Sequence, residues 1–128
     1  MNGKRSLAGL ILVLIILLHN ACAFLAGGAA GIGAIAFIGG ELKSTEEVSL
    51  DTAWNATIKA IDEMEFTVES KNKDAFSAEL IGVIASGKQL TINLKKESDR
   101  FVEIRIRVGF FGNEFLSQRI LEKIRKNY

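Results

Sequence analysis

Hydrophobic and polar residues are distributed in two different ways along the chain. No charged residue occurs between Leu7 and Gly40, whereas all charged residues except Lys4 and Arg5 lie at Glu41 or beyond. Past Glu41, apolar residues recur with the periods of half-buried helices and strands. The pattern therefore predicts a membrane-directed N-terminal third followed by a small folded domain.

Two segments of this domain have the period of an amphipathic helix. One apolar face comprises Leu50, Trp54, Thr57, Ile58, Ile61 and Met64. The other, near the end of the chain, comprises Phe115, Leu116, Ile120, Leu121 and Ile124. Ser49 or Asp51 is the expected N-cap of the first helix, since short polar side chains bind the free N–H groups there.

Four segments between the helices alternate as strands do, within residues 66–70, 76–83, 90–95 and 101–108. In the second segment, the apolar residues change from even-numbered to odd-numbered positions beside Gly82, which predicts a β-bulge there. A loop of residues 98–100 would join the last two strands and set Lys95 opposite Glu103, because both strands point their even-numbered residues inward.

Residues 41–128 are therefore expected to form an α+β domain of the order helix, four antiparallel strands, helix. Each helix has one apolar stripe and the sheet has one apolar face. The simplest arrangement that buries all three is a two-layer sandwich with both helices on the same face of a four-stranded sheet.

The N-terminal third resembles an export signal. Lys4 and Arg5 precede twelve uncharged residues, 7–18, which as a helix would reach only about 18 Å. Cys22 follows, with Ala21 before it, as at a bacterial lipoprotein cleavage site. We expect residues 1–21 to be a signal peptide and Cys22 to carry a palmitate-type lipid anchor. Residues 22–40 would form a Gly/Ala-rich membrane-proximal segment.

An uncleaved N-terminal helix is the alternative, with Cys22 as a buried free thiol. In that case Gly27 and Gly31 would let two membrane helices approach closely. The same small residues also suit a flexible spacer. The run from Gly31 to Ala36 imitates a dinucleotide-binding fingerprint, but no strand is predicted before it, and we reject that interpretation.

Composition excludes several kinds of chemistry. The net charge of +1 gives no basic footprint for nucleic acid. His19 is the only histidine and Cys22 the only cysteine, so the domain after Cys22 has no imidazole to activate a nucleophile or bind a metal. The acidic residues fall mostly at turns, element ends and polar helix faces. We therefore expect no catalytic, cofactor or metal site, and no enzyme.

The role of Phe111 is left open by the pattern. With Gly112 as N-cap of the last helix, Phe111 would pack on Leu116 in a hydrophobic staple. Alternation instead places Phe110 inward and Phe111 outward, where it would be an exposed contact for a partner. The staple is favoured because it needs no partner, and Phe111→Ala would then lower the melting temperature by several degrees.

Three stretches carry a resemblance to a known family. They are GELKSTEEVSLDTAWNATIKAI from Gly40, FVEIRIRVG from Phe101 and FGNEFLSQRILEKI from Phe111. With the signal-like start, the Cys and the Gly/Ala-rich stretch, the chain resembles a family of small bacterial lipoproteins of unknown function. That resemblance implies an envelope location and carries no active-site residues.

Two functions are consistent with these observations. The first is a lipid-anchored, non-catalytic binding or scaffold module that faces the periplasm and recruits an envelope protein through the charged face or the edge of its sheet. The second is an accessory subunit of a membrane complex, held by the uncleaved helix. Ala23, which is not acidic, favours the outer membrane over the inner.

Overall fold

The computed structural model describes residues 3, 7–9, 11 and 34–128. The chain divides into two compact units, one in the N-terminal segment and one that contains residues 34–128. In the first unit, the described residues 3, 7–9 and 11 are helical. Among the described residues, no helix has both the length and the hydropathy to cross a membrane.

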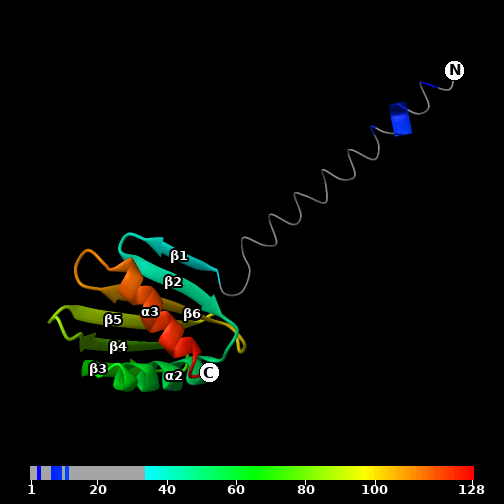
Figure 1. Ribbon diagram of the computed structural model, residues 1–128. Coiled ribbons are helices and arrows are strands. Elements are labelled where there is room, and N and C mark those ends of the chain that lie inside the picture. Colours follow the sequence, from blue (N-terminus) through cyan, green and yellow to red (C-terminus); the bar gives the residue numbers. More distant parts are fainter. Residues whose placement is uncertain (1–2, 4–6, 10, 12–33) are drawn as a thin grey trace. The chain divides into compact units, whose positions relative to one another are not determined.

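The second unit is built on one antiparallel sheet (Figure 1). Its elements are β1 (Ile35–Ile38), β2 (Glu41–Glu46), α2 (Leu50–Glu63), β3 (Thr67–Lys73), β4 (Ser77–Val83), β5 (Gln89–Lys96), β6 (Val102–Val108) and α3 (Glu114–Arg125). The spatial order of the strands is β1-β2-β6-β5-β4-β3, so β2 is inserted beside β6, far from it in sequence.

The expected four-stranded sheet with two helices is wrong. The sheet has six strands, because β1 and β2 extend it beyond β6, and the helical residues of the N-terminal unit add a third helix. At β2 the sequence indicates only a short extended piece over residues 41–45, because the inward positions are Leu42, Ser44 and Glu46, of which only the first is apolar. β1 is four apolar residues within the segment expected to lie next to the membrane.

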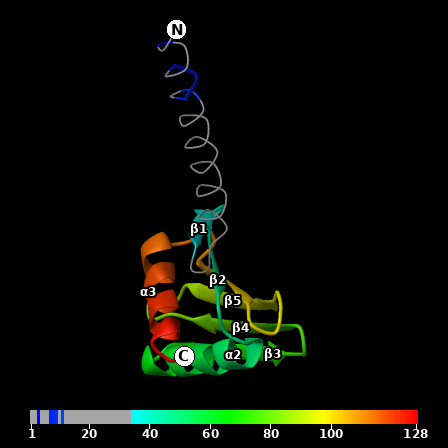
Figure 2. The same cartoon turned by 90° about the vertical axis from the view of Figure 1, so that its right-hand side faces the viewer.

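Helices α2 and α3 pack on the same face of the sheet (Figure 2). Helix α2 contacts β4 and β5, α3 contacts β2 and β6, and the two helices contact each other. The largest fully buried side chains are Leu42, Ile61, Leu80, Leu90, Ile92, Leu94, Ile104, Ile106, Ile120, Leu121, Ile124 and Val102. Burying each of these contributes roughly 1.5–3 kcal/mol, so this layer is the main source of stability.

Local hydrogen bonds and backbone conformation explain where helix α2 begins and ends. The Oγ of Ser49, the N-cap, accepts a hydrogen bond from the N–H of Thr52 at 3.1 Å, as one of the two expected caps. At the other end Glu65 has a φ of 58°, and the N–H of Phe66 reaches back to the carbonyl of Ile61 at 3.2 Å. The helix is therefore fixed at both ends by its own sequence.

The irregularity near Gly82 lies on the opposite strand from the one expected. Val68 pairs with Gly82 and Ser70 with Ile81, so the extra residue is Glu69 of β3. A Cβ at Gly82 would lie 2.6 Å from the carbonyl oxygen of Thr67, which explains the glycine. The predicted change of parity in β4 is wrong, since its buried residues remain on one face. They are Ala78, Leu80 and Gly82.

The hairpin of β5 and β6 has the predicted register. Lys95 lies opposite Glu103, and the N–H of Glu97 bonds the carbonyl of Phe101 at 2.9 Å, which closes the loop of residues 98–100. The ion pairs of Lys95 and Glu103 nevertheless form with residues two positions away along the chain, and not across the hairpin. Glu103 binds Arg105, and the Lys95 ammonium lies 3.9 Å from Glu97.

The start of α3 differs from the sequence-based expectations in several respects. Its N-cap is Asn113 instead of Gly112, and Asn113 Oδ1 accepts from the N–H of Leu116 at 2.9 Å. Phe111 is 87% exposed, so the hydrophobic staple is wrong, and the reason to expect a lower melting temperature for Phe111→Ala is removed. Phe110 and Phe115 also project into solvent, because the chain leaves the strand at Gly109 and the helix presents Phe115 outward.

Candidate functional site

The face of the sheet that the helices leave uncovered is polar in its centre. Alternate residues of β2, β6, β5 and β4 point to this side and are half-buried. Among them are Glu41, Lys43, Thr45, Glu79, Thr91, Asn93, Glu103, Arg105 and Arg107. Side chains of both charges thus lie over a rigid support.

Strand register sets four of these side chains and Asn72 of β3 in one line, which we call the polar row. Lys43 lies opposite Arg105, Arg105 opposite Asn93, Asn93 opposite Glu79, and Glu79 opposite Asn72. Directly opposed residues on one face have Cβ atoms about 4.5–5.5 Å apart. The row therefore crosses five strands, with two basic groups at one end and a carboxylate between two amides at the other.

A hollow of about 720 Å³ lies along the polar row. Its polar side chains include Glu41, Asn72, Glu79, Asn93, Lys95 and Arg105. The hollow is open and shallow, and most of its charged groups keep contact with water. Such a surface suits recognition of a polar chain better than enclosure of a small apolar ligand.

Arg105 is the best-anchored charge of the row. Its Nε donates to Glu103 Oε1, and its Nη1 lies 4.0 Å from Glu41 Oε1. The hydrogen bond that Arg105 donates to Glu103, followed by the charge of that carboxylate, raises the pKa of Arg105 above its ordinary value. The guanidinium is therefore held between two carboxylates, with one side left toward the hollow.

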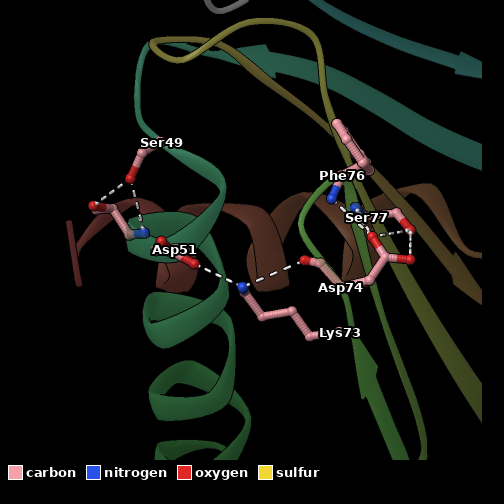
Figure 3. A network of polar contacts seen from close by, with 7 residues as sticks. Ser49, Asp51, Lys73, Asp74, Phe76 and Ser77 are labelled. Carbon is pink, nitrogen blue, oxygen red and sulfur yellow. Dashed lines mark hydrogen bonds and ion pairs between the residues drawn. The ribbon is translucent and has the colours of Figure 1, made fainter.

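The turn between β3 and β4 forms one wall of the hollow. Figure 3 shows the polar contacts of this turn. Asp74 Oδ1 accepts from the N–H groups of Phe76 at 2.7 Å and Ser77 at 2.9 Å. These two backbone donors lower the pKa of Asp74. The Lys73 ammonium reaches from this turn to Asp51 in the first turn of α2, at 2.7 Å.

A second polar cluster lies on the covered face, where β2 meets the end of α3. Arg125 Nε lies 3.1 Å from both carboxylate oxygens of Glu46, and Nη2 donates to Ser44 Oγ at 3.2 Å. The bond to Glu46 raises the pKa of Arg125, and burial with the charge of Glu46 raises the pKa of Tyr128. Ser44, Glu46 and Arg125 bind one another, so this cluster attaches β2 to α3.

The residue expected to carry lipid, Cys22, lies outside the described residues. The same holds for His19 and for the pair Gly27 and Gly31. In the described part of the chain, no group of three or more His, Cys, Asp or Glu side chains is placed to hold a metal ion.

The family model described as Protein of unknown function (DUF3568) matches residues 6–127. The chain belongs to the DUF3568 family. The match includes the apolar N-terminal segment as well as the whole sheet, so the two parts are one family unit in sequence. A comparison with curated proteins gave no match.

The polar row of this DUF3568 protein is not evident from the sequence, because its acidic residues occupy positions that are usually exposed to solvent. One part of the row was within reach. The predicted hairpin that sets Lys95 opposite Glu103 also sets Asn93 opposite Arg105. The position of Glu79 needed the register of β4 against β5, and that of Lys43 needed β2.

Proposed function

We propose that this protein is a lipid-anchored lipoprotein of the bacterial envelope that acts as a non-catalytic binding module. It recruits an envelope protein through the hollow on the uncovered face of its sheet. The polar row is the observation that carries this proposal, since it places donors, acceptors and both charges in one line on a rigid support.

The anchor is supported by the position of the only thiol. Cys22 closely follows a twelve-residue apolar run, residues 7–18, that is by itself too short to cross a bilayer as a helix, and Lys4 and Arg5 precede this run. The family match begins at residue 6, so this segment belongs to the family pattern. In the proposed arrangement the lipid lies in the membrane, with the outer membrane favoured, and the domain faces the periplasm.

The binding role is supported by the chemistry of the polar row. The amides of Asn72 and Asn93 each donate and accept, Glu79 accepts, and Arg105 donates. A polar segment of a partner protein lying across the strands would find complementary groups at each step. Charged rows of this kind set specificity and association rate more than affinity.

Lipid labelling tests the anchor. Cells that express the full chain are fed a labelled palmitate, and the parent is compared with Cys22→Ser. We expect the parent to be labelled and shortened to start at residue 22, and the variant to remain an unlabelled precursor. Unchanged labelling of the variant, or a parent whose intact mass retains residues 1–21, would favour the uncleaved anchor of an accessory subunit.

Photo-crosslinking tests the binding face. A photoreactive residue replaces Asn93 in the hollow or, as a matched control, the exposed Asn55 on α2. We expect an adduct with an envelope protein from position 93 and none from position 55. The adduct should be lost on adding Glu79→Lys and kept with Lys59→Glu on α2. Equal adducts from both positions would overturn the proposed face.

A further inference from the structure

The end of the sheet where β6 stops carries a cluster of exposed aromatic side chains. Phe110 is 86% exposed, Phe111 87% and Phe115 70%. They lie within residues 109–115, which we call the aromatic loop. Phenylalanine is usually buried, so three exposed phenylalanines within seven residues are unusual, and exposed apolar side chains of this kind mark interaction surfaces.

The aromatic loop is held firmly in this exposed position. Arg107 donates from Nη2 to the carbonyl of Gly39 at 2.9 Å and from Nη1 to that of Phe110 at 3.3 Å. The backbones of Gly40 and Gly112 pack against each other so closely that a Cβ on Gly112 would overlap Gly40. The loop therefore rests on the turn between β1 and β2.

That turn adds one more apolar side chain to the cluster. Ile38, which immediately precedes Gly39, is 63% exposed. The guanidinium of Arg107 binds the carbonyl of Gly39, next to Ile38, and the carbonyl of Phe110, so one cation links the two segments. The rings of Phe110 and Phe111 stack edge to face, with centroids 5.0 Å apart.

The charges beside these side chains are mainly basic. Lys88 and Arg107 line a hollow of about 690 Å³ together with Phe110 and Phe111. The guanidinium carbon of Arg119 lies 5.8 Å from the centre of the Phe115 ring. The neighbouring carboxylate, Glu114, lines a separate groove with Ile35 and Phe37. Aromatic groups ringed by cations are the composition of interfacial membrane contacts.

We propose that the aromatic loop inserts into the surface of an anionic phospholipid bilayer. This inference rests on the proposed anchor at Cys22, because the tether determines which surface the loop can reach. From Cys22 to residue 34 the chain spans at most about 40 Å when fully extended, so the lipid would keep the domain beside its own membrane. The phenyl rings enter the acyl boundary, while Lys88 and Arg119 bind phosphate groups.

Depth-dependent fluorescence quenching tests the inference on the full chain. In a Trp54→Phe background, the single tryptophan is placed by Phe111→Trp or, as a matched control, by Phe76→Trp. Phe76 is 73% exposed and lies beside the start of β4, at the opposite end of the strands. The protein is reconstituted in vesicles of phosphatidylethanolamine and phosphatidylglycerol with brominated acyl chains. We expect at least twofold stronger quenching at position 111.

Two further measurements test whether anionic lipid and Lys88 contribute to the quenching. Exchange of phosphatidylglycerol for phosphatidylcholine, and Lys88→Glu, should each weaken quenching at position 111 and leave position 76 unchanged. Equal quenching at the two positions would overturn the inference. So would a tryptophan at 111 that bromolipid does not quench but that is shielded from aqueous iodide, since a protein would then cover it. Flotation of the vesicles and labelling of Cys22 report separately on the anchor.

Discussion

The sheet is attached to the helices by two ion pairs, one near each of its edges, that differ in burial. At the β2 end, Glu46 is buried against α3 and binds Arg125, with side-chain exposures of 7% and 31%. At the β3 end, Lys73 of the strand binds Asp51 of α2, and the Asp51 side chain is 78% exposed. Both contacts join a strand to a helix through an ion pair, yet their expected energetic weights differ strongly.

Burial explains the difference. A charge removed from water loses its hydration, so Glu46 depends on Arg125 and Ser44 to replace that hydration. Asp51 keeps most of its hydration whether or not Lys73 is present, and exposed pairs typically contribute 0.2–1 kcal/mol. The β2 end is therefore sensitive to loss of one partner, whereas the β3 end tolerates it.

Glu46→Ala should have the largest effect. It leaves Arg125 facing a cavity without its carboxylate, and we expect a loss of about 3–4 kcal/mol in the free energy of unfolding. Urea titration of the parent and the variant measures the loss. Glu46→Gln, which keeps the shape and accepts hydrogen bonds, should lose less. A loss below about 1 kcal/mol for the alanine variant would show that the two ends are equivalent.

Gly112→Ala tests the backbone contact between Gly112 and Gly40, which immediately precedes β2. Gly112 has a φ of 82°, and an added Cβ would overlap Gly40, so we expect a loss of about 2–3 kcal/mol. Gly87 is the matched control, because it has a φ of 84° and open space around its Cβ position. Gly87→Ala should lose only about 1–2 kcal/mol. Equal losses would mean that the contact between the two turns contributes nothing.

The same comparison separates what the sequence could predict from what it could not. β5 and β6 alternate cleanly between apolar and polar residues, and their loop determines their register, so both follow from the chain alone. β2 places Ser44 and Glu46 on its buried side, which looks like a solvated strand or a loop. Only the distant Arg125, 79 residues away, makes those positions acceptable inside the protein.

The candidate site follows the same rule. Arg105 beside Asn93 depends on a hairpin with a short loop, which is local information. The rest of the polar row depends on β2 and on the bulge at Glu69, which shifts β3 by one residue and brings Asn72 opposite Glu79. A bulge depends on packing between strands, and the sequence pattern placed it on β4 instead.

Acid should weaken the contacts at the β3 end. The pKa of Asp51 is lowered by its bond to Lys73, and that of Asp74 by the N–H groups of Phe76 and Ser77. A lowered pKa in the folded state means that the stabilisation is complete above the unfolded value, 3.8, and is lost as pH falls through the folded value. Stability should therefore decrease as the pH falls below about 4.

Asp74→Asn separates this titration from the turn itself. The amide oxygen of Asn still accepts from both backbone groups, so the turn is retained while the titrating carboxylate is removed. We expect the variant to lose less stability than the parent between pH 5 and about pH 3, measured by urea titration at each pH. Parallel pH profiles for parent and variant would contradict a role for Asp74 in acid sensitivity.

The smallest effect is expected at the exposed ion pair. In a double-mutant cycle of Lys73→Ala and Asp51→Ala, measured by urea titration at neutral pH, the coupling energy should be about 0.5 kcal/mol or less. High salt should reduce it further, because exposed pairs are screened. Glu46→Ala and Ser44→Ala provide the buried reference, with coupling of about 1 kcal/mol or more because the two side chains share Arg125. If the exposed pair couples as strongly as the buried one, burial is not what distinguishes the two ends, and the attachment of β3 to α2 is a structural requirement of the fold.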